Sequence, residues 1–159
     1  MGRSSFFKYN IGGQANTGSI VGQGGSTAVT VPSASIDMAT QQNRAVTVPR
    51  AGTITSVTGF FSVSEAVTFS GSTVAIKMQV FVAPAKSNVF TFVSGTEVSL
   101  GALVGNTWEG TVYSGIASEL SIPVTAQSRI LVVYSAAVTS GLDIALTVKG
   151  YVETSIGIS

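Results

Sequence analysis

Apolar and polar residues alternate at every second position along much of the chain after residue 26. In the clearest run, residues 73–84, one side of the expected strand carries Val74, Ile76, Met78, Val80 and Val82. The other side is mixed and includes Lys77 and Phe81. A period of two indicates a β-strand with one face in a core. No stretch repeats every 3.6 residues over a dozen positions, so the pattern predicts strands and no long helix.

Further runs predict a series of short strands. Val46 and Val48 alternate before a turn at residues 49–52, and residues 129–138 form a nearly continuous apolar run, typical of a strand buried on both faces. The last part of the chain alternates again, with one side formed by Ile144, Leu146, Val148, Gly150 and Val152. About eight to ten strands separated by turns indicate an all-β fold, either a sandwich or a jelly roll. We assign this single domain to residues 27–159.

One break in the alternation is expected. Ile54 and Val57 do not share the register of a single strand face, although both are apolar. A β-bulge changes the register within a strand, and glycine often marks one. The sequence therefore predicts a bulge near Gly59.

Residues 1–26 follow a different pattern. Phe6, Phe7 and Tyr9 form an aromatic head, and a tether rich in Gly, Ser, Asn and Gln continues to residue 26. Gly-rich chains are flexible, whereas disordered tails are usually poor in aromatic residues. We therefore expect an N-terminal arm in which Phe6, Phe7, Tyr9 and Ile11 dock into a neighbouring subunit. Two other interpretations stay open: a disordered tail, and an arm that folds back on its own domain.

Charge is scarce in this chain. Only 9% of the residues are charged, against about 25% in typical domains, and the formal net charge is +1. The Lys and Arg residues are scattered rather than clustered, which argues against a nucleic-acid partner. A neutral surface rich in hydroxyl groups favours association, so it suits a packed assembly.

The chain contains neither Cys nor His. Disulfides, thiolate chemistry and Cys-based metal sites are therefore excluded, and the commonest general base and metal ligand is missing. Glu97, Glu109 and Glu119 are far apart in sequence and are interpreted as rim charges rather than a catalytic pair. The glycine-rich stretch of residues 12–25 lacks the Gly-Lys-Ser/Thr ending of a phosphate-binding loop. We expect no enzyme, no cofactor and no metal site.

Three other residues carry alternatives. Lys77 and Lys149 lie in strand patterns; both are expected to face solvent, although each is also a possible amine for an isopeptide crosslink or an axial ion pair. Trp108 is expected in the core, with stacking on a sugar as the alternative. No run reaches the roughly 18 apolar residues of a membrane span, and no apolar segment after Arg3 indicates a signal peptide.

Several segments together resemble a known family. They are the turn Pro49-Arg50-Ala51-Gly52-Thr53-Ile54-Thr55-Ser56, the strand start Gly71-Ser72-Thr73, the stretch from Val124 through Ala137, and the pair Gly150-Tyr151. In order and spacing, residues 44–159 resemble the C-terminal domain of the BclB-type exosporium glycoproteins of spore-forming bacteria. Two features depart from the family: a collagen-like Gly-X-Y region is missing, and Ala51 replaces the usual Asp in the turn.

The resemblance implies a jelly roll of the C1q or tumour-necrosis-factor kind, assembled as a homotrimer on the spore surface. It also implies assembly from the mother cell, which requires no signal peptide. Without a collagen stalk, the chain is expected to be a structural subunit of an exosporium fibre or endospore appendage. Its trimers would stack head-to-tail through the N-terminal arm, with an anchoring exosporium protein and a tip protein as possible further partners. The alternative is a trimeric head that binds a receptor or glycan.

Overall fold

The computed structural model describes residues 4–9, 15–22, 25–30, 34–40, 44–141 and 147–159. Within these residues all regular structure is β, which confirms the all-β prediction. The strands are β1 (Ser4–Tyr9), β2 (Ala15–Gly22), β3 (Gly25–Thr30), β4 (Ser35–Asp37), β5 (Val46–Thr47), β6 (Gly52–Val63), β7 (Val67–Ala83), β8 (Val89–Phe92), β9 (Val98–Thr107), β10 (Val112–Ala117), β11 (Ile122–Val124), β12 (Arg129–Gly141) and β13 (Thr147–Ile158).

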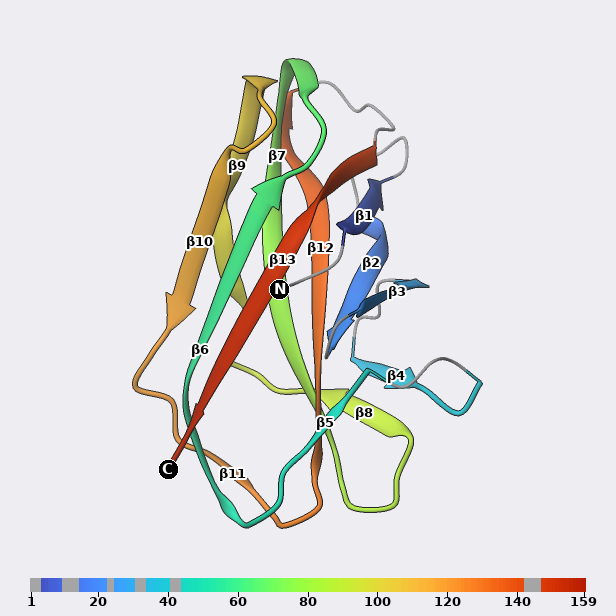
Figure 1. Ribbon diagram of the computed structural model, residues 1–159, viewed down its shortest axis with the longest axis vertical. Coiled ribbons are helices and arrows are strands. Elements are labelled where there is room, and N and C mark those ends of the chain that lie inside the picture. The colour runs from blue at the N-terminus through green and yellow to red at the C-terminus, as the bar shows by residue number, and fades with distance from the viewer. Residues whose placement is uncertain (1–3, 10–14, 23–24, 31–33, 41–43, 142–146) are drawn as a thin grey trace.

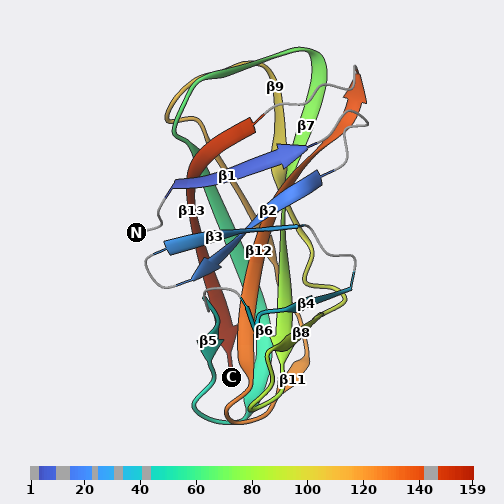
Figure 2. The same ribbon diagram turned by 90° about the vertical axis from the view of Figure 1, so that its right-hand side faces the viewer.

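The strands form two antiparallel sheets that pack face to face as a β-sandwich (Figure 1). One sheet has the order β10-β6-β13-β1, with β11 paired to β6. The other has the order β2-β12-β7-β8-β4, with β9 paired to β7, β5 to β12 and β3 to β2. Figure 2 shows β1, β2 and β3 lying across one side of the sandwich, where the pairing of β1 with β2 joins the two sheets.

The main core lies between the sheets. The alternation expected for residues 73–84 is confirmed, because Val74, Ile76, Met78 and Val80 are all in this core. The apolar run of β12 is buried on both faces, as predicted: Ile130 and Val132 face the main core, whereas Leu131 and Val133 belong to a second cluster. That second cluster lies on the other side of β7 and β12 and includes Ile36, Met38, Phe81, Ala83 and Phe90.

The bulge predicted near Gly59 is wrong in position. Ile156 pairs with Val57 and Ile158 with Ile54, so the register shifts between Gly157 and Ile158, beside the first part of β6. From Val57 to Val63 the strand alternates regularly, with every second residue buried. Gly59 points inward within this regular stretch: a Cβ there would lie 2.9 Å from the Met78 sulfur and 3.0 Å from the Tyr134 hydroxyl oxygen. Gly59 therefore makes room for packing and does not mark a bulge.

The segment expected to be a flexible tether contains two strands in this single chain. β2 pairs with β12 through Ile20↔Val133 and Val21↔Val132, and β3 pairs with β2. The domain boundary expected after residue 26 therefore falls inside β3. Backbone pairing needs no large side chains, so a glycine-rich segment can still satisfy the unpaired amide and carbonyl groups of a sheet edge. Ile144 and Leu146, expected on the last strand, lie outside the described residues.

Candidate functional site

The residues predicted to dock the arm lie partly on β1. Phe6 pairs with Lys149 and Phe7 with Val148 of β13, in antiparallel register, and Tyr9 pairs with Ala15 of β2. Ile11 lies outside the described residues. In the single chain β1 therefore occupies a place on its own sheet, which corresponds to the fold-back alternative. Docking of these residues into a neighbouring subunit is not tested by one chain and stays a prediction.

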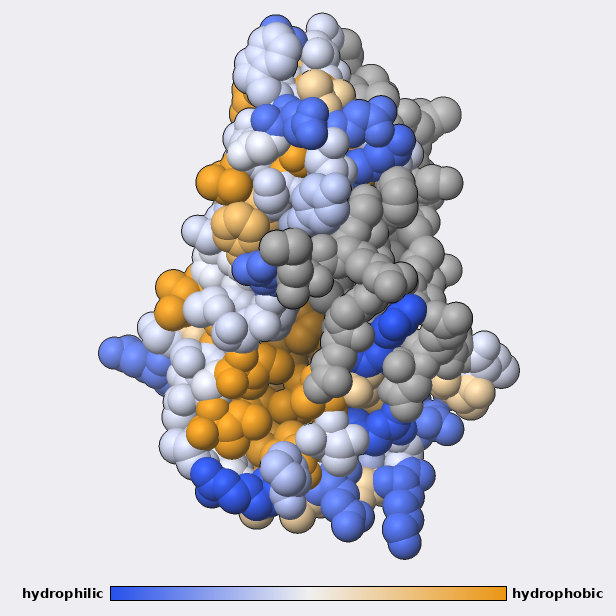
Figure 3. Space-filling model, viewed as in Figure 1, coloured by the Kyte–Doolittle hydropathy of each residue, from blue (hydrophilic) through white to orange (hydrophobic). Residues whose placement is uncertain are grey.

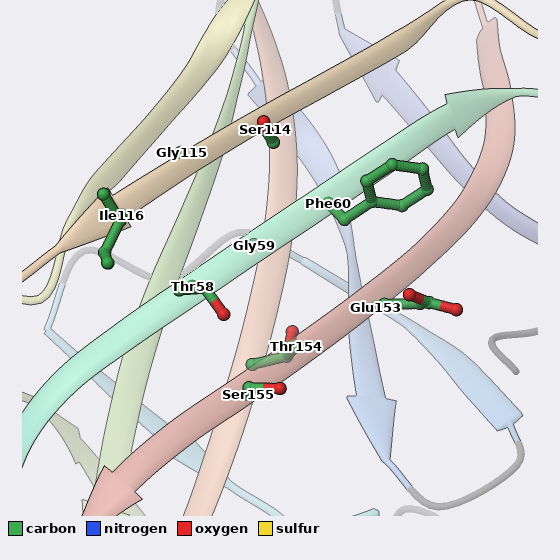
Figure 4. A pocket seen from close by; sticks show the side chains of 9 residues that line it. All are labelled: Thr58, Gly59, Phe60, Ser114, Gly115, Ile116, Glu153, Thr154 and Ser155. Carbon is green, nitrogen blue, oxygen red and sulfur yellow. The ribbon is translucent and has the colours of Figure 1, made fainter.

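A hollow of about 420 Å³ opens on the outer face of the first sheet. Its lining comes from three neighbouring strands: Thr58, Gly59 and Phe60 on β6, Ser114, Gly115 and Ile116 on β10, and Glu153, Thr154 and Ser155 on β13 (Figure 4). This volume falls within the range of small-molecule sites, about 300–1,000 Å³.

The register of the three strands sets the side chains of the hollow in rows. Ser114 lies opposite Phe60, which lies opposite Glu153, so these three residues form one row across the sheet. Ile116, Thr58 and Ser155 form the next row. Successive outward-facing residues of a strand are two positions apart, so the two rows are neighbours on the same face. The two rows thus combine one aromatic ring, one carboxylate, one aliphatic side chain and three hydroxyl groups.

Phe60 and Glu153 are the two residues of the hollow with the most distinctive chemistry. Phe60 is half-buried and Glu153 is exposed. Figure 4 shows the Phe60 ring and the Glu153 side chain extending from adjacent strands toward the same side. A carboxylate next to an aromatic face favours a cation, because both the charge and the ring quadrupole attract it.

Beneath the hollow, a polar contact ties the two sheets together. The hydroxyl of Tyr134 on β12 donates a hydrogen bond of 2.6 Å to the carbonyl oxygen of Glu153 and lies 2.8 Å from the Thr154 hydroxyl. The Thr154 hydroxyl also lies 3.7 Å from the sulfur of Met78. Tyr134 is fully buried, and this burial raises the pKa of its hydroxyl from 10.0 to about 12. The charge of Glu153 raises this pKa further, and the hydrogen bond with Thr154 opposes the shift.

Replacing Tyr134 with phenylalanine is expected to lower the free energy of unfolding by about 1–2 kcal/mol at neutral pH, because the hydrogen bond to β13 is lost. The deficit should shrink at alkaline pH. Between pH 10 and 12 an unfolded tyrosine ionises while folded Tyr134 stays protonated, so the wild-type protein loses stability as pH rises, by up to about 1.4 kcal/mol per pH unit. Urea unfolding of both proteins from pH 7 to pH 12 measures this difference.

The control for this experiment is Tyr151→Phe, which removes the hydroxyl of a tyrosine that is 49% exposed. At pH 7 this control should change the free energy of unfolding by less than about 0.5 kcal/mol. A deficit of the Tyr134→Phe variant that stays constant from pH 8 to pH 12 would contradict the assignment of the raised pKa to Tyr134.

The charged residues singled out from the sequence lie at the surface. Lys77 forms a 2.9 Å ion pair with Glu97, and Lys149 forms a 2.6 Å ion pair with Glu65. Lys77 and Lys149 are partly exposed, as expected. Glu109 and Glu119 are exposed and lie in different loops, so they form no pair with Glu97. Within the described ranges no group of three or more acidic residues is placed to hold a metal ion, and no helix is long and apolar enough to span a membrane.

Trp108 does not lie in the core, contrary to the prediction. It is 68% exposed in the turn between β9 and β10. Its position immediately after a strand, followed by Glu109 and Gly110, places it where the chain reverses at the end of the sandwich. The irregular pattern of residues 101–128 gave no register from which to predict this side chain's direction.

Sequence reasoning also missed the residues of the hollow. Phe60 and Phe61 are consecutive in the sequence and face opposite sides of the strand. Only the register of the strand decides which of the two rings is buried. Glu153 carries no signal until β13 is paired with β6, because the row containing both residues depends on that register. The one available signal was Phe60, an outward-facing aromatic residue at the centre of a strand, which could have pointed to a binding surface.

Comparison of the chain with protein-family models and with curated proteins gave no match.

Proposed function

We propose that this protein is a structural subunit of a bacterial spore-surface fibre or appendage, a homotrimer that stacks head-to-tail through its N-terminal segment. The observation that carries the proposal is the place of β1, which pairs through its backbone with β13 at the side of the first sheet. Strand addition of this kind works equally well with a strand from another chain. A β1 that leaves its own β13 and pairs with that of a neighbour would join trimers in series, and a contact of this type does not close.

The fold supports the finer assignment to a C1q or tumour-necrosis-factor-like jelly roll. Within the two sheets, the runs β10-β6-β13-β1 and β2-β12-β7-β9 each contain four antiparallel strands. A jelly roll is a double sheet of eight strands, and two runs of four antiparallel strands are compatible with it.

Exposed apolar side chains support self-association. Figure 3 shows hydrophobic side chains gathered on the lower part of one face, over the last residues of β13. β13 contributes half-buried Ile156 and Ile158 to this end of the strand. Large apolar side chains are also exposed elsewhere on the single chain: Val46, Val89, Val104, Trp108, Val112, Ile116 and Tyr151. In a chain with so few charges, such positions favour contact with further copies.

Electron microscopy of the purified full-length chain tests this function. We expect filaments from the wild-type chain and only soluble trimers after deletion of residues 2–10. The triple variant Phe6→Ser, Phe7→Ser, Tyr9→Ser, which keeps the backbone length, is expected to shorten the filaments rather than abolish them, because backbone pairing persists. Filaments of normal length from the deletion variant would exclude the arm as the connector.

A second experiment separates exchange from fold-back. The chain has no cysteine, so one protein carrying Ser4→Cys can be mixed with another carrying Tyr151→Cys; these positions are partners in the β1–β13 register. Mild oxidation with dithiodipyridine should give a covalent heterodimer when β1 pairs with a neighbour's β13. Ser4→Cys mixed with Glu119→Cys is the control with no such pairing. Crosslinking only within a chain carrying both substitutions would show that β1 stays on its own domain.

The hollow favours a second candidate function. A trimeric spore-surface head that binds a receptor or glycan needs a concave site with a few converging polar groups, and the hollow on β6, β10 and β13 has this character. Monodisperse trimers without filaments under the electron microscope would favour this alternative.

A further inference from the structure

We propose that the hollow on β6, β10 and β13 binds an amino sugar through its free ammonium group. This inference depends on the binding role given as the second candidate function and is independent of fibre formation. It concerns the ligand class, which neither the sequence pattern nor the fold type specifies.

Glu153 forms no ion pair with any residue that the structure describes. Three described basic side chains have other partners: Lys149 contacts Glu65, Lys77 contacts Glu97, and Arg129 contacts the Ser87 carbonyl and Asn88. None of the ion pairs found among the described residues includes Glu153, although its charge is felt by Tyr134 below. An exposed carboxylate at the edge of a concave site attracts a cation from solution.

An aromatic ring lies next to this carboxylate. Phe60 is the direct cross-strand neighbour of Glu153, and both extend to the same side of the sheet (Figure 4). A cation held between an aromatic face and a carboxylate gains from both, and an ammonium group on an apolar ring is the arrangement that suits this pair. The apolar ring faces of a pyranose also pack on an aromatic side chain, so Phe60 accommodates either part of the ligand.

Hydroxyl groups form much of the remaining lining of the hollow. Thr58, Ser114 and Ser155 line the hollow, and each hydroxyl both donates and accepts hydrogen bonds. The Thr154 hydroxyl already contacts the Tyr134 hydroxyl, so it contributes to contact between the sheets rather than to ligand binding. Three hydroxyl groups match a polyhydroxylated ligand, whereas a simple alkylammonium ion would leave them in contact with water only. A hexosamine with a free amino group satisfies the hydroxyl groups, the carboxylate and the ring together.

The experiment uses saturation-transfer difference NMR on the full-length chain, a method that tolerates assemblies of any size. The probes are glucosamine, glucose, N-acetylglucosamine and choline. We expect glucosamine to bind about 5- to 30-fold more tightly than glucose or N-acetylglucosamine, because only glucosamine presents an ammonium group to Glu153 and Phe60. Choline carries the charge without the sugar hydroxyls and should bind more weakly than glucosamine. The preference for glucosamine should fall as the salt concentration rises.

Three variants locate the effect. Glu153→Gln keeps the shape of the side chain and should reduce glucosamine to the affinity of glucose. Phe60→Leu keeps an apolar side chain without the ring and should weaken glucosamine several-fold. Glu109→Gln removes one negative charge from an exposed turn outside the hollow and should leave all affinities unchanged.

Each outcome decides between the two claims. Equal affinity for glucosamine and glucose, both lost in Phe60→Leu, would overturn the amine specificity and leave the glycan-binding role standing. A preference for glucosamine that survives Glu153→Gln would overturn the proposed site. Binding of none of the probes would overturn both claims, and the hollow would then be a surface covered by a second copy or left to solvent.

Discussion

Replacing Phe61 with alanine is expected to lower the free energy of unfolding by about 3–5 kcal/mol. Phe61 is fully buried in the main core, among the residues that β6 and β13 direct toward β7 and β12. Truncation removes the transfer free energy of the ring and leaves a cavity that a packed sandwich fills only in part. Urea-induced unfolding, followed by tryptophan fluorescence or circular dichroism at one protein concentration, measures the change.

The matched control is the neighbouring residue. Phe60→Leu alters an aromatic side chain of the same strand that is half-buried on the outer face, and it should cost less than about 1 kcal/mol. The contrast between two consecutive phenylalanines tests the register of β6 directly, because a shift by one residue would exchange their faces. Equal effects of the two substitutions, or a larger effect at Phe60, would show that β6 is placed wrongly.

Replacing Gly150 with alanine is expected to lower the free energy of unfolding by about 2–3 kcal/mol. Gly150 lies on β13 opposite Val63, and a Cβ there would overlap the ring of Phe61 and lie 2.6 Å from the Ser62 carbonyl oxygen. The ring fills the space that a side chain would need, so a methyl group must displace either the ring or the strand. Ser155→Ala, at an exposed position of the same strand, is the control and should change stability by less than about 0.5 kcal/mol.

The two substitutions should not be additive. In the double variant Phe61→Ala, Gly150→Ala, the new methyl group enters space that the ring has left, so the combined loss should be smaller than the sum of the single losses. A double-mutant cycle with the same urea measurement gives this coupling. Additive losses would mean that the Ser62 carbonyl, and not the Phe61 ring, limits the space at Gly150.

The parts of the fold that were predicted correctly are those in which a side-chain period reports burial directly. In β7 the alternation of Val74, Ile76 and Met78 is the alternation of a strand facing the main core. In β12 the unbroken apolar run follows from the second cluster, since Leu131 and Val133 need cover on the face opposite to Val132. Such patterns are visible in one chain without knowledge of the partner strands.

The parts that were predicted wrongly depend on backbone partners or on register. The tether was predicted from its glycine content. However, β2 and β3 are held by main-chain pairing, which amino-acid composition does not predict. The bulge was placed at Gly59 because glycine often marks one, whereas the register shift lies beside Gly157. Trp108 was expected in the core, but it is 68% exposed in a turn, where the direction of the chain positions the side chain.

The candidate site was beyond the reach of the sequence for a related reason. Phe60, Ser114 and Glu153 come from three strands that are distant in the sequence and form one row only when β6 pairs with both β10 and β13. Neither the spacing of these residues in the sequence nor their type indicates that they lie in one row. A side-chain pattern reports which face a residue occupies, but it does not identify the neighbour across the sheet.

The pairing of β1 with β13 has a consequence for synthesis of the protein. β1 is made before β2–β13, yet its partner β13 is the last of these strands to leave the ribosome. During translation the β1 segment must therefore wait without its β13 partner while the rest of the sandwich is made, and closing so long a loop is slow. Neighbouring nascent or finished chains can offer a β13 edge during this interval, so the balance between self-pairing and exchange is expected to depend on the local protein concentration and the rate of synthesis.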